Sequence, residues 1–425
     1  MESYSDLASY SAALDDRGNA PVGFHCAVTS IDFRPAERET TEPLTMNLSA
    51  VVLDEPTRSF SGMFTKNRFP GAPVILCRER IAGSRISGIL VNNRIANVCA
   101  PDGVEDARRV TGRFAAQVGC EGDEILPAST GIIGWKLPVD AMIPALAPLA
   151  RRLGSDTPVD VARGIMTTDS YPKLRSAGVG DGRIVCVAKG AGMIEPDMAT
   201  LLVFIFTDIS IERKPLQRHL EDAVTGSFNI VSVDGDQSTS DMVIALTSNR
   251  KRCDEVEFAE TLSRLCYELA MDVIRNGEGT EHVIRVRVAS APSREIAAGC
   301  AKAVVNSPLV KTAVCGNDPN VGRVIGAIGD FAGSNGVGLD TRAVRVAIGD
   351  EEVFAGGVFT LDPDRERRLA RYLTDARSTA SEDGFPAHDR SVEICIDLGS
   401  GNSTGGAIGS DLTHGYVSEN ADYRS

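Results

Sequence analysis

The chain has 425 residues, of which 24% are charged, and its formal net charge is −14. A chain of this length can bury a sizeable core, which we expect to be divided into two or three lobes. The acidic balance, without a long basic run or an aromatic–basic stripe, argues against nucleic acid and anionic membrane as partners. No apolar run approaches the ~18–20 residues of a membrane span, and residues 1–17 lack the basic and apolar regions of a signal peptide.

Cysteine and histidine usage indicates a cytoplasmic protein without a catalytic metal. The ten cysteines are scattered, and none forms a CxxC pair. In a chain of this length this pattern is typical of reduced, mostly buried thiols. The five histidines form neither an HxxxH nor an HExxH motif, so we expect no metal site.

The first part of the chain is predicted to alternate strands and helices. Residues 1–20 are polar and expected to be loose. Short apolar runs predict strands at Val51–Leu53, Val74–Cys77 and Gly88–Val91. Apolar residues at four-residue spacing predict an amphipathic helix over Glu105–Val118.

Two threonine-containing turns follow. Thr130 and Gly131 lie in LPASTGIIG, whose small side chains suit a backbone N–H that points at a ligand; a Ser–Thr turn capping the next helix is the commoner explanation. Thr167 and Thr168 lie in IMTTD, where a capped Thr–Asp turn is the plain alternative. Spacing alone does not decide which of these two threonines would contact a ligand.

The central stretch, Lys189–Asp208, contains a threonine placed as a nucleophile would be. Leu201–Phe206 is an uncharged apolar run that predicts a strand buried on both faces, and Thr200 directly precedes it. A threonine hydroxyl needs a base, which an N-terminal threonine finds in its own α-amine, titrating at about 7.7–8.0. Thr200 would gain that amine only by cleavage of the Ala199–Thr200 bond; otherwise it is an ordinary threonine at the start of a strand.

Two charged residues lie where local structure does not explain them. Lys189 follows a predicted buried strand, Arg183–Ala188, and precedes two glycines, so we expect a functional lysine whose charge would lower the pKa of a Thr200 amine. Glu278 lies just past the C-terminus of an amphipathic helix predicted over Phe258–Asn276, where an acidic side chain opposes the helix dipole.

The remaining elements continue the alternation. SVDGD at residues 232–236 lacks the spacing of an EF-hand and is interpreted as a structural turn. Further helices are predicted at Leu216–Val224, Arg294–Val314, with a break near Pro308, and Asp364–Ala376. Further strands are predicted at His282–Ser290, Val344–Ile348 and Val392–Leu398.

Seven motifs occur in an order that resembles the glutamate/ornithine N-acetyltransferase family, the bifunctional, self-processing acetyltransferases of arginine biosynthesis. They are STG, TTD, KGAGMIEPDMAT, SVDGD, GEG, DPN.GR and N..YRS, where a dot stands for any residue. The matching segments run from about residue 60 to the end of the chain. One such motif is weak support, whereas the ordered set is strong.

The resemblance implies a fold and a processed assembly. The fold class is α/β: a layered α/β sandwich similar to that of N-terminal-nucleophile enzymes, with a smaller C-terminal α/β lobe expected over residues 283–390. Self-cleavage would give an alpha chain, residues 1–199, and a beta chain, residues 200–425. We expect an oligomer of two alpha and two beta chains in the cytoplasm, acting on small-molecule amino-acid substrates.

The resemblance also assigns roles to individual residues. Cleavage between Ala199 and Thr200 would free Thr200 as the nucleophile that carries an acetyl group from N-acetylornithine to glutamate. Thr130 and Gly131 would form the oxyanion hole. The substrate-binding residues would be Thr167 or Thr168, Lys189, Thr200, Glu278, Asn420 and Ser425. No cofactor is implied, and acetyl-coenzyme A is left open as a secondary acetyl donor.

Several positions depart from the family pattern. Arg94 and Ile95 interrupt the Asn-rich loop where the family usually has glycine, Val321 replaces a usual tryptophan, and Ser410 stands where cysteine is frequent. These departures keep three alternatives open: an acyltransferase for another amino acid in specialised metabolism, an amidase or aminopeptidase, and a non-enzymatic paralogue that stays uncleaved.

Overall fold

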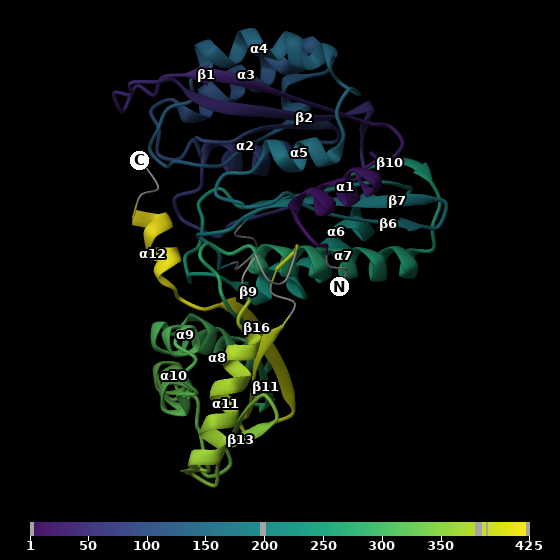
Figure 1. Ribbon diagram of the computed structural model, residues 1–425. Coiled ribbons are helices and arrows are strands. Elements are labelled where there is room, and N and C mark those ends of the chain that lie inside the picture. Colours follow the sequence, from purple (N-terminus) through teal and green to yellow (C-terminus); the bar gives the residue numbers. More distant parts are fainter. Residues whose placement is uncertain (1–3, 196–200, 379–384, 388–389, 422–425) are drawn as a thin grey trace.

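Two β-sheets, with helices between them and on both outer faces, form the larger part of the molecule (Figure 1). The computed structural model describes residues 4–195, 201–378, 385–387 and 390–421. A third sheet with its own helices forms a smaller C-terminal lobe. The prediction of a layered α/β sandwich with a smaller C-terminal α/β lobe is therefore confirmed.

The first sheet has four strands in the order β1-β2-β4-β5. β2 pairs antiparallel with both β1 and β4, and β5 pairs in parallel with β4. Apolar residues on its outer face pack against the helices α3 and α4. The bounds are β1 Phe24–Phe33, β2 Leu44–Thr57, β4 Ile86–Asn92, β5 Ile125–Ser129, α3 Gly103–Val118 and α4 Val139–Arg151, with a short 3-10 helix at Gly122–Glu124.

The second sheet has five strands in the order β3-β10-β8-β7-β6. Its central strand β8, Leu202–Ile209, is buried at every residue, which confirms the strand predicted from the apolar run. The helices α6 and α7 cover one face of this sheet. The bounds are β3 Phe60–Phe64, β6 Lys173–Val179, β7 Gly182–Lys189, β10 Met242–Lys251, α6 Arg213–Thr225 and α7 Glu255–Arg275.

The helices α2, Ala72–Arg80, and α5, Pro158–Gly164, lie in the core between the two sheets. The strand predicted at Val74–Cys77 is wrong, because this run belongs to α2. The helix begins after Gly71 with Pro73 in its first turn, and its apolar residues contact both sheets. A short apolar run fits a buried helix as well as a strand.

The N-terminal segment is also more ordered than predicted. Residues 7–17 form the helix α1, Leu7–Arg17, which begins at an Asp6 cap. Tyr10 and Leu14 are buried, and the Tyr10 hydroxyl donates to the carbonyl of Pro172 at 2.9 Å. Two apolar anchors on one helical face are enough to dock this otherwise polar segment.

The C-terminal lobe is built on a seven-stranded sheet in the order β14-β13-β12-β15-β11-β16-β9. The sheet continues past residue 390 through β15 and β16, so the lobe expected over 283–390 extends to Ser410. Its strands are β9 Val231–Ser232, β11 Val283–Ala291, β12 Arg345–Ile348, β13 Glu351–Ala355, β14 Val358–Phe359, β15 Ser391–Asp397 and β16 Ser403–Ser410. Its helices are α8 Arg294–Asn306, α9 Pro308–Cys315, α10 Val321–Ser334 and α11 Pro363–Ala376.

Two features connect the lobe to the larger part. β9 follows a short 3-10 helix, Phe228–Ile230, of the larger part, and pairs in parallel with β16. The last helix, α12 at His414–Ala421, returns from the lobe toward the two-sheet sandwich (Figure 1).

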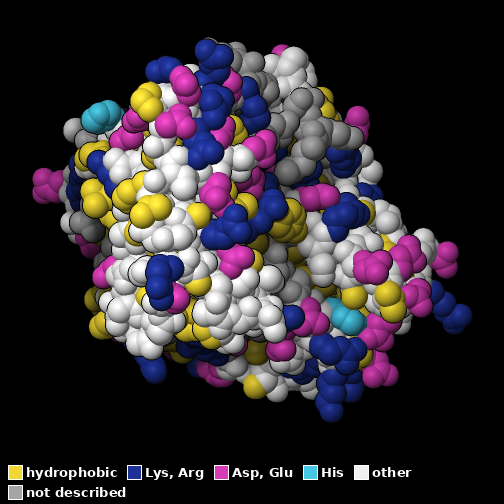
Figure 2. Space-filling view, turned by 90° about the horizontal axis from the view of Figure 1, so that it is seen from below, with side chains coloured by type: hydrophobic (Ala, Val, Ile, Leu, Met, Phe, Trp, Pro, Cys, Tyr) yellow, Lys and Arg dark blue, Asp and Glu magenta, His cyan; other side chains and the backbone are white. Residues whose placement is uncertain are grey.

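Figure 2 shows acidic and basic side chains interspersed over the face seen from below. Among the helices that the structure describes, none combines the length and the hydropathy needed to cross a bilayer.

Candidate active site

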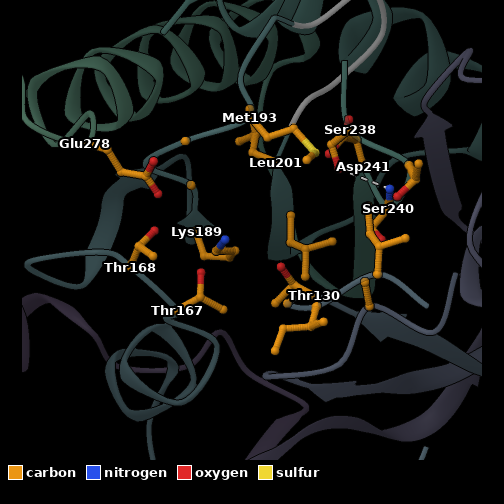
Figure 3. Close-up of a pocket in the computed structure, with 18 of the residues that line it drawn as sticks. Thr130, Thr167, Thr168, Lys189, Met193, Leu201, Ser238, Ser240, Asp241 and Glu278 are labelled. Carbon is orange, nitrogen blue, oxygen red and sulfur yellow. Dashed lines mark hydrogen bonds between the residues drawn. The ribbon is translucent and has the colours of Figure 1, made fainter. Parts of the chain in front are cut away.

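The topology of the second sheet brings the C-terminal end of β7 and the N-terminal ends of β8 and β10 to the same side of the sheet. β7 runs antiparallel to β8 and ends at Lys189, where β8 begins. β10 runs parallel to β8, and Met242 at its start pairs with Leu202. A cavity of about 240 Å³ lies at this edge (Figure 3). Its lining includes Ala96, Thr130, Gly131, Ile132, Ile133, Thr167, Thr168, Lys189, Gly190, Gly192, Met193, Leu201, Leu202, Ser238, Thr239, Ser240, Asp241, Glu278 and Asn420.

Thr130 and Gly131 follow directly after β5 and face this cavity. The backbone N–H of Thr130 donates to the carbonyl of Asn92 at 3.1 Å, which fixes the turn against β4. Gly131 has a φ of +123°, and a Cβ at this position would lie 2.2 Å from the backbone carbonyl carbon of Arg94. Only glycine fits here, so the turn presents backbone and a hydroxyl to the cavity.

Thr167 and Thr168 both line the cavity, so the structure does not separate the two candidates. Asp169 holds their segment in place, because its Oδ2 accepts the N–H of Thr167 at 3.1 Å. The Oδ1 of the same carboxylate accepts the N–H of Gly190 at 2.9 Å. The two threonines are thereby fixed relative to the segment that carries Lys189.

Glu278 lies on the opposite side of the view from Thr130, with Lys189 between them (Figure 3). Its side chain is buried, and its backbone N–H donates to the carbonyl of Ala191 at 2.9 Å. A Cβ on Gly192 would lie 2.1 Å from the Glu278 carboxylate, so a glycine is needed for this close approach.

Asn420, on α12, reaches the cavity from the C-terminal end of the chain. Its Nδ2 donates to Glu278 Oε2 at 2.7 Å. On the same helix the Tyr416 hydroxyl donates to Asp234 Oδ2 at 3.1 Å, and Asp234 also accepts the N–H of Met193. The SVDGD segment therefore acts as a structural turn that anchors both α12 and the Gly190–Met193 segment.

A second opening of about 310 Å³ shares Gly131, Ile132, Thr167 and Thr168 with the cavity and is also lined by Arg94 and Glu419. Burial, together with the charge of Glu278, raises the pKa of Glu419. Arg94, one of the positions that depart from the family pattern, thus lies at this second opening beside the cavity.

Three predicted site residues, Ala199, Thr200 and Ser425, lie outside the described residues. Thr200 is bonded to Leu201, which lines the cavity. Their predicted roles, and those of the residues that the structure brings together, stay predictions.

The sequence analysis missed one wall of the cavity. Ser238, Thr239, Ser240 and Asp241 line it where the chain enters β10. In the sequence these residues appear only as a polar continuation of the SVDGD turn. A run of polar residues directly before an apolar strand, Met242–Leu246, was the available signal.

The cavity combines groups that suit a small zwitterionic ligand. It offers the carboxylate of Glu278, the ammonium of Lys189 and several hydroxyl groups within a small volume. Such a set can bind the amino and carboxyl groups of an amino acid. In the described part of the chain, no group of three or more His, Cys, Asp or Glu residues is arranged to hold a metal ion.

Comparisons with known protein sequences indicate one family. A sequence model of the ArgJ family matches residues 36–425. The arginine biosynthesis bifunctional protein ArgJ of Rhodococcoides fascians is 37% identical over 99% of this chain and 96% of its own length. The protein of the same name from Nitratidesulfovibrio vulgaris is 36% identical over 96% of this chain and 99% of its own. The crystal structure of the Bacillus halodurans ArgJ is 34% identical, covers 53% of this chain and 100% of that chain, and has a TM-score of 0.46.

Proposed function

The chain belongs to the ArgJ family, and we propose that it transfers an acetyl group from N-acetylornithine to glutamate, with Thr200 as the carrier. The observation that carries the proposal is the convergence of Thr130, Gly131 and Lys189 with Glu278 on one cavity beside Leu201. Acyl transfer needs a nucleophile, an oxyanion site and an amino-acid site within reach of each other.

The first half-reaction acylates the enzyme. Thr200 Oγ attacks the acetyl carbonyl carbon of N-acetylornithine, and its proton passes to the Thr200 α-amine. The hydroxyl of Thr130 and the N–H of Gly131 donate to the oxyanion that forms. The bond between the acetyl carbon and the substrate nitrogen then breaks, and the nitrogen takes the proton from the amine. Ornithine leaves, and the acetyl group remains as an ester on Thr200.

The second half-reaction reverses these steps with a different amine. The amino group of glutamate attacks the ester carbon, Thr200 Oγ is the leaving group, and N-acetylglutamate departs. Both substrates present an amino-acid backbone, which suits one site used in turn. We assign Glu278 and Asn420 to the side-chain ammonium of N-acetylornithine, whose α-nitrogen is the acetylated amide, and Lys189 to its carboxylate, because opposite charges attract strongly at a buried site.

The proposal includes processing and assembly. Self-cleavage between Ala199 and Thr200 supplies the α-amine and leaves chains of residues 1–199 and 200–425. β8 begins at Leu202, two residues after Thr200, and lies between β10 and β7, of which β7 belongs to the first chain, so both chains stay together. We further propose an assembly of two alpha and two beta chains in the cytoplasm, and catalysis without a cofactor.

Steady-state kinetics test this function. With N-acetylornithine varied at several glutamate concentrations, double-reciprocal plots should give parallel lines, because the acetyl-enzyme separates the two half-reactions. Intersecting lines would contradict the scheme. Release of acetate at the same rate without glutamate would instead identify an amidase. A panel of other N-acetyl amino acids and acetyl-coenzyme A in place of N-acetylornithine defines the donor.

A further inference from the structure

Arg94 is held beside the Gly131 turn of the cavity, yet the reaction described so far gives it no role. A Cβ on Gly131 would lie 2.7 Å from the Cα of Arg94, so the two backbones are in contact. The N–H of Ile132 donates to the carbonyl of Arg94 at 2.9 Å. On the other side, Asn92 Nδ2 donates to the carbonyl of Ile95 at 2.8 Å. These hydrogen bonds fix the backbone of Arg94 relative to the cavity.

The backbone of Arg94 adopts a conformation that favours glycine. Its φ is +71°, in the left-handed region, where a Cβ is unfavourable. A bulky residue at such a position carries a conformational cost, which points to a use for its side chain. Arg94 Nε donates to the carbonyl of Thr45 at 3.2 Å. The N–H groups of its two terminal nitrogens have no acceptor among the described residues, so they are free to bind a ligand.

Arg94 lies where a ligand in the cavity can extend toward solvent. The second opening, of about 310 Å³, is lined by Arg94 and Glu419 and shares four residues with the cavity, namely Gly131, Ile132, Thr167 and Thr168. Because the cavity and the opening have these walls in common, a small molecule bound near Lys189 can place its far end in the opening.

Few ionisable groups surround these two spaces. Among the described residues that line them, Lys189 and Arg94 are the cations, and Asp241, Glu278 and Glu419 carry carboxyl groups. Burial raises the pKa of Asp241 well above its ordinary value, and its Oδ2 has no hydrogen-bond partner, so its neutral form is favoured. The negative side of the site is therefore formed by Glu278 and Glu419, and its positive side by Lys189 and Arg94.

The two substrates of the proposed reaction carry different charges. N-acetylornithine has one carboxylate and a side-chain ammonium, which match Lys189 and Glu278. Glutamate attacks through its α-nitrogen and has two carboxylates. The α-carboxylate can pair with Lys189, as that of the donor does. The side-chain carboxylate would be repelled by Glu278 and needs a second cation.

We propose that Arg94 is a specificity-determining residue of the second half-reaction, whose guanidinium binds the side-chain carboxylate of glutamate at the second opening. The inference rests on the proposed function, which takes glutamate as the acceptor. A guanidinium is always charged and presents paired N–H groups that match the two oxygens of a carboxylate. The donor's side chain thus meets Glu278 and the acceptor's side chain meets Arg94, so one cavity serves both substrates in turn.

Three substitutions of Arg94 test whether its charge selects the acceptor. In Arg94→Gln, KM for glutamate should rise at least about tenfold, because the charged hydrogen bonds are lost. Arg94→Lys keeps the charge without the paired geometry and should give a smaller rise. Arg94→Glu has nearly the shape of Arg94→Gln but repels the acceptor, so its KM should be the highest of the three. Arg58→Gln, at an exposed position between β2 and β3, is the matched control and should leave KM unchanged.

Isotope exchange measures the first half-reaction separately. Incorporation of labelled ornithine into N-acetylornithine, without glutamate, needs only acylation of the enzyme and its reversal. In Arg94→Gln this exchange rate should change by less than about threefold, while transfer to glutamate falls.

Two results would overturn the proposal. One is a KM for glutamate that is unchanged in Arg94→Gln. The other is an equal loss of exchange and of transfer to glutamate in that variant, because Arg94 would then support the cavity as a whole. Failure of the proposed function looks different, since wild type itself would then show neither ornithine exchange nor transfer to glutamate.

Discussion

Asp169 and Lys173 form an ion pair with an N···O distance of 2.5 Å in which neither side chain is exposed to solvent. Lys173 Nζ also donates to Asn276 Oδ1 at 2.6 Å, and Asn276 caps α7 just before Glu278. The carboxylate of Asp169 in turn holds the N–H groups of Thr167 and Gly190. Three walls of the cavity are therefore positioned by one buried pair that is not itself part of the cavity lining among the described residues.

Replacing one partner of this pair should destabilise the protein strongly. Burial raises the pKa of Asp169, but the charge of Lys173 outweighs it, so the pKa lies well below its ordinary value. Asp169→Asn leaves the Lys173 charge buried and uncompensated. We expect a loss of about 3–5 kcal/mol in the free energy of unfolding, measured by urea denaturation at pH 7.

The matched control is an exposed pair. Arg108 on α3 and Glu79 on α2 are joined at 2.6 Å, and both side chains are about half exposed. Glu79→Gln should change the free energy of unfolding by no more than about 0.5 kcal/mol. Equal effects of the two substitutions would show that burial of the Asp169–Lys173 pair is not what makes it important.

Gly192 should control the position of Glu278. A Cβ at this residue would lie 2.1 Å from Glu278 Oε2, so Gly192→Ala must push the carboxylate away from Asn420. We expect KM for N-acetylornithine to rise at least about tenfold, equivalent to about 1.4 kcal/mol of binding free energy. Initial-rate measurements over a range of donor concentrations check this.

Gly329→Ala serves as the control for the same substitution. Gly329 lies in α10, and a Cβ there would meet no atom within 4 Å. KM should stay unchanged, and the free energy of unfolding should rise by about 0.5–1 kcal/mol because alanine favours a helix. An unchanged KM in Gly192→Ala as well would exclude Glu278 from substrate binding.

The proposed oxyanion donors should serve both cleavage and turnover. Thr200→Ala should leave one intact chain, since no hydroxyl can attack the Ala199 carbonyl, and Thr200→Ser should still be cleaved. Thr130→Ala should slow self-cleavage and lower kcat by roughly 100–1,000-fold if one oxyanion site serves both steps. Gel electrophoresis and N-terminal sequencing of the second fragment follow the cleavage. A cleaved Thr200→Ala chain would show that another agent cuts the protein.

The sequence predicted the elements whose pattern is long or unambiguous. The buried strand β8 was predicted from its uncharged apolar run, and the amphipathic helix α7 was predicted from the spacing of its apolar residues. The ordered motifs identified residues from five segments that the fold brings to one cavity, although no motif says how they meet. The strand predicted at Val74–Cys77 was wrong because four apolar residues fit a helix and a strand equally well.

What the sequence did not predict depends on pairing across the fold. Asp169 and Lys173, the first residue of β6, are separated by the non-helical residues Ser170, Tyr171 and Pro172, so their spacing gives no helical signal of a pair. Asp241 enters the site only because β10 lies parallel to β8, a relationship between residues about forty positions apart. Such residues become visible when their burial and missing partners are known.

Lys311, on α9, provides a test of how the burial of one amine affects the dependence of stability on pH. Its Nζ donates to the carbonyl of Val233 at 2.8 Å and also to that of Ser410. Burial lowers the pKa of Lys311 from 10.5 to about 8, although the charges of Asp411 and Asp234 act in the opposite direction. The folded state therefore binds fewer protons than the unfolded state between about pH 8 and pH 10.5.

The contribution of Lys311 to stability should consequently rise with pH in this window. Lys311→Met removes the titration, so wild type should gain roughly 2–3 kcal/mol in the free energy of unfolding relative to the variant between pH 7 and pH 10. Lys214→Met, at an exposed position of α6, should give a difference from wild type that does not change with pH. A constant difference for Lys311→Met as well would mean that Lys311 titrates alike in both states. Subtracting the free energy of unfolding of the variant from that of wild type cancels the titration of all groups that the two proteins share. The slope of this difference against pH therefore reports on the Lys311 amine alone.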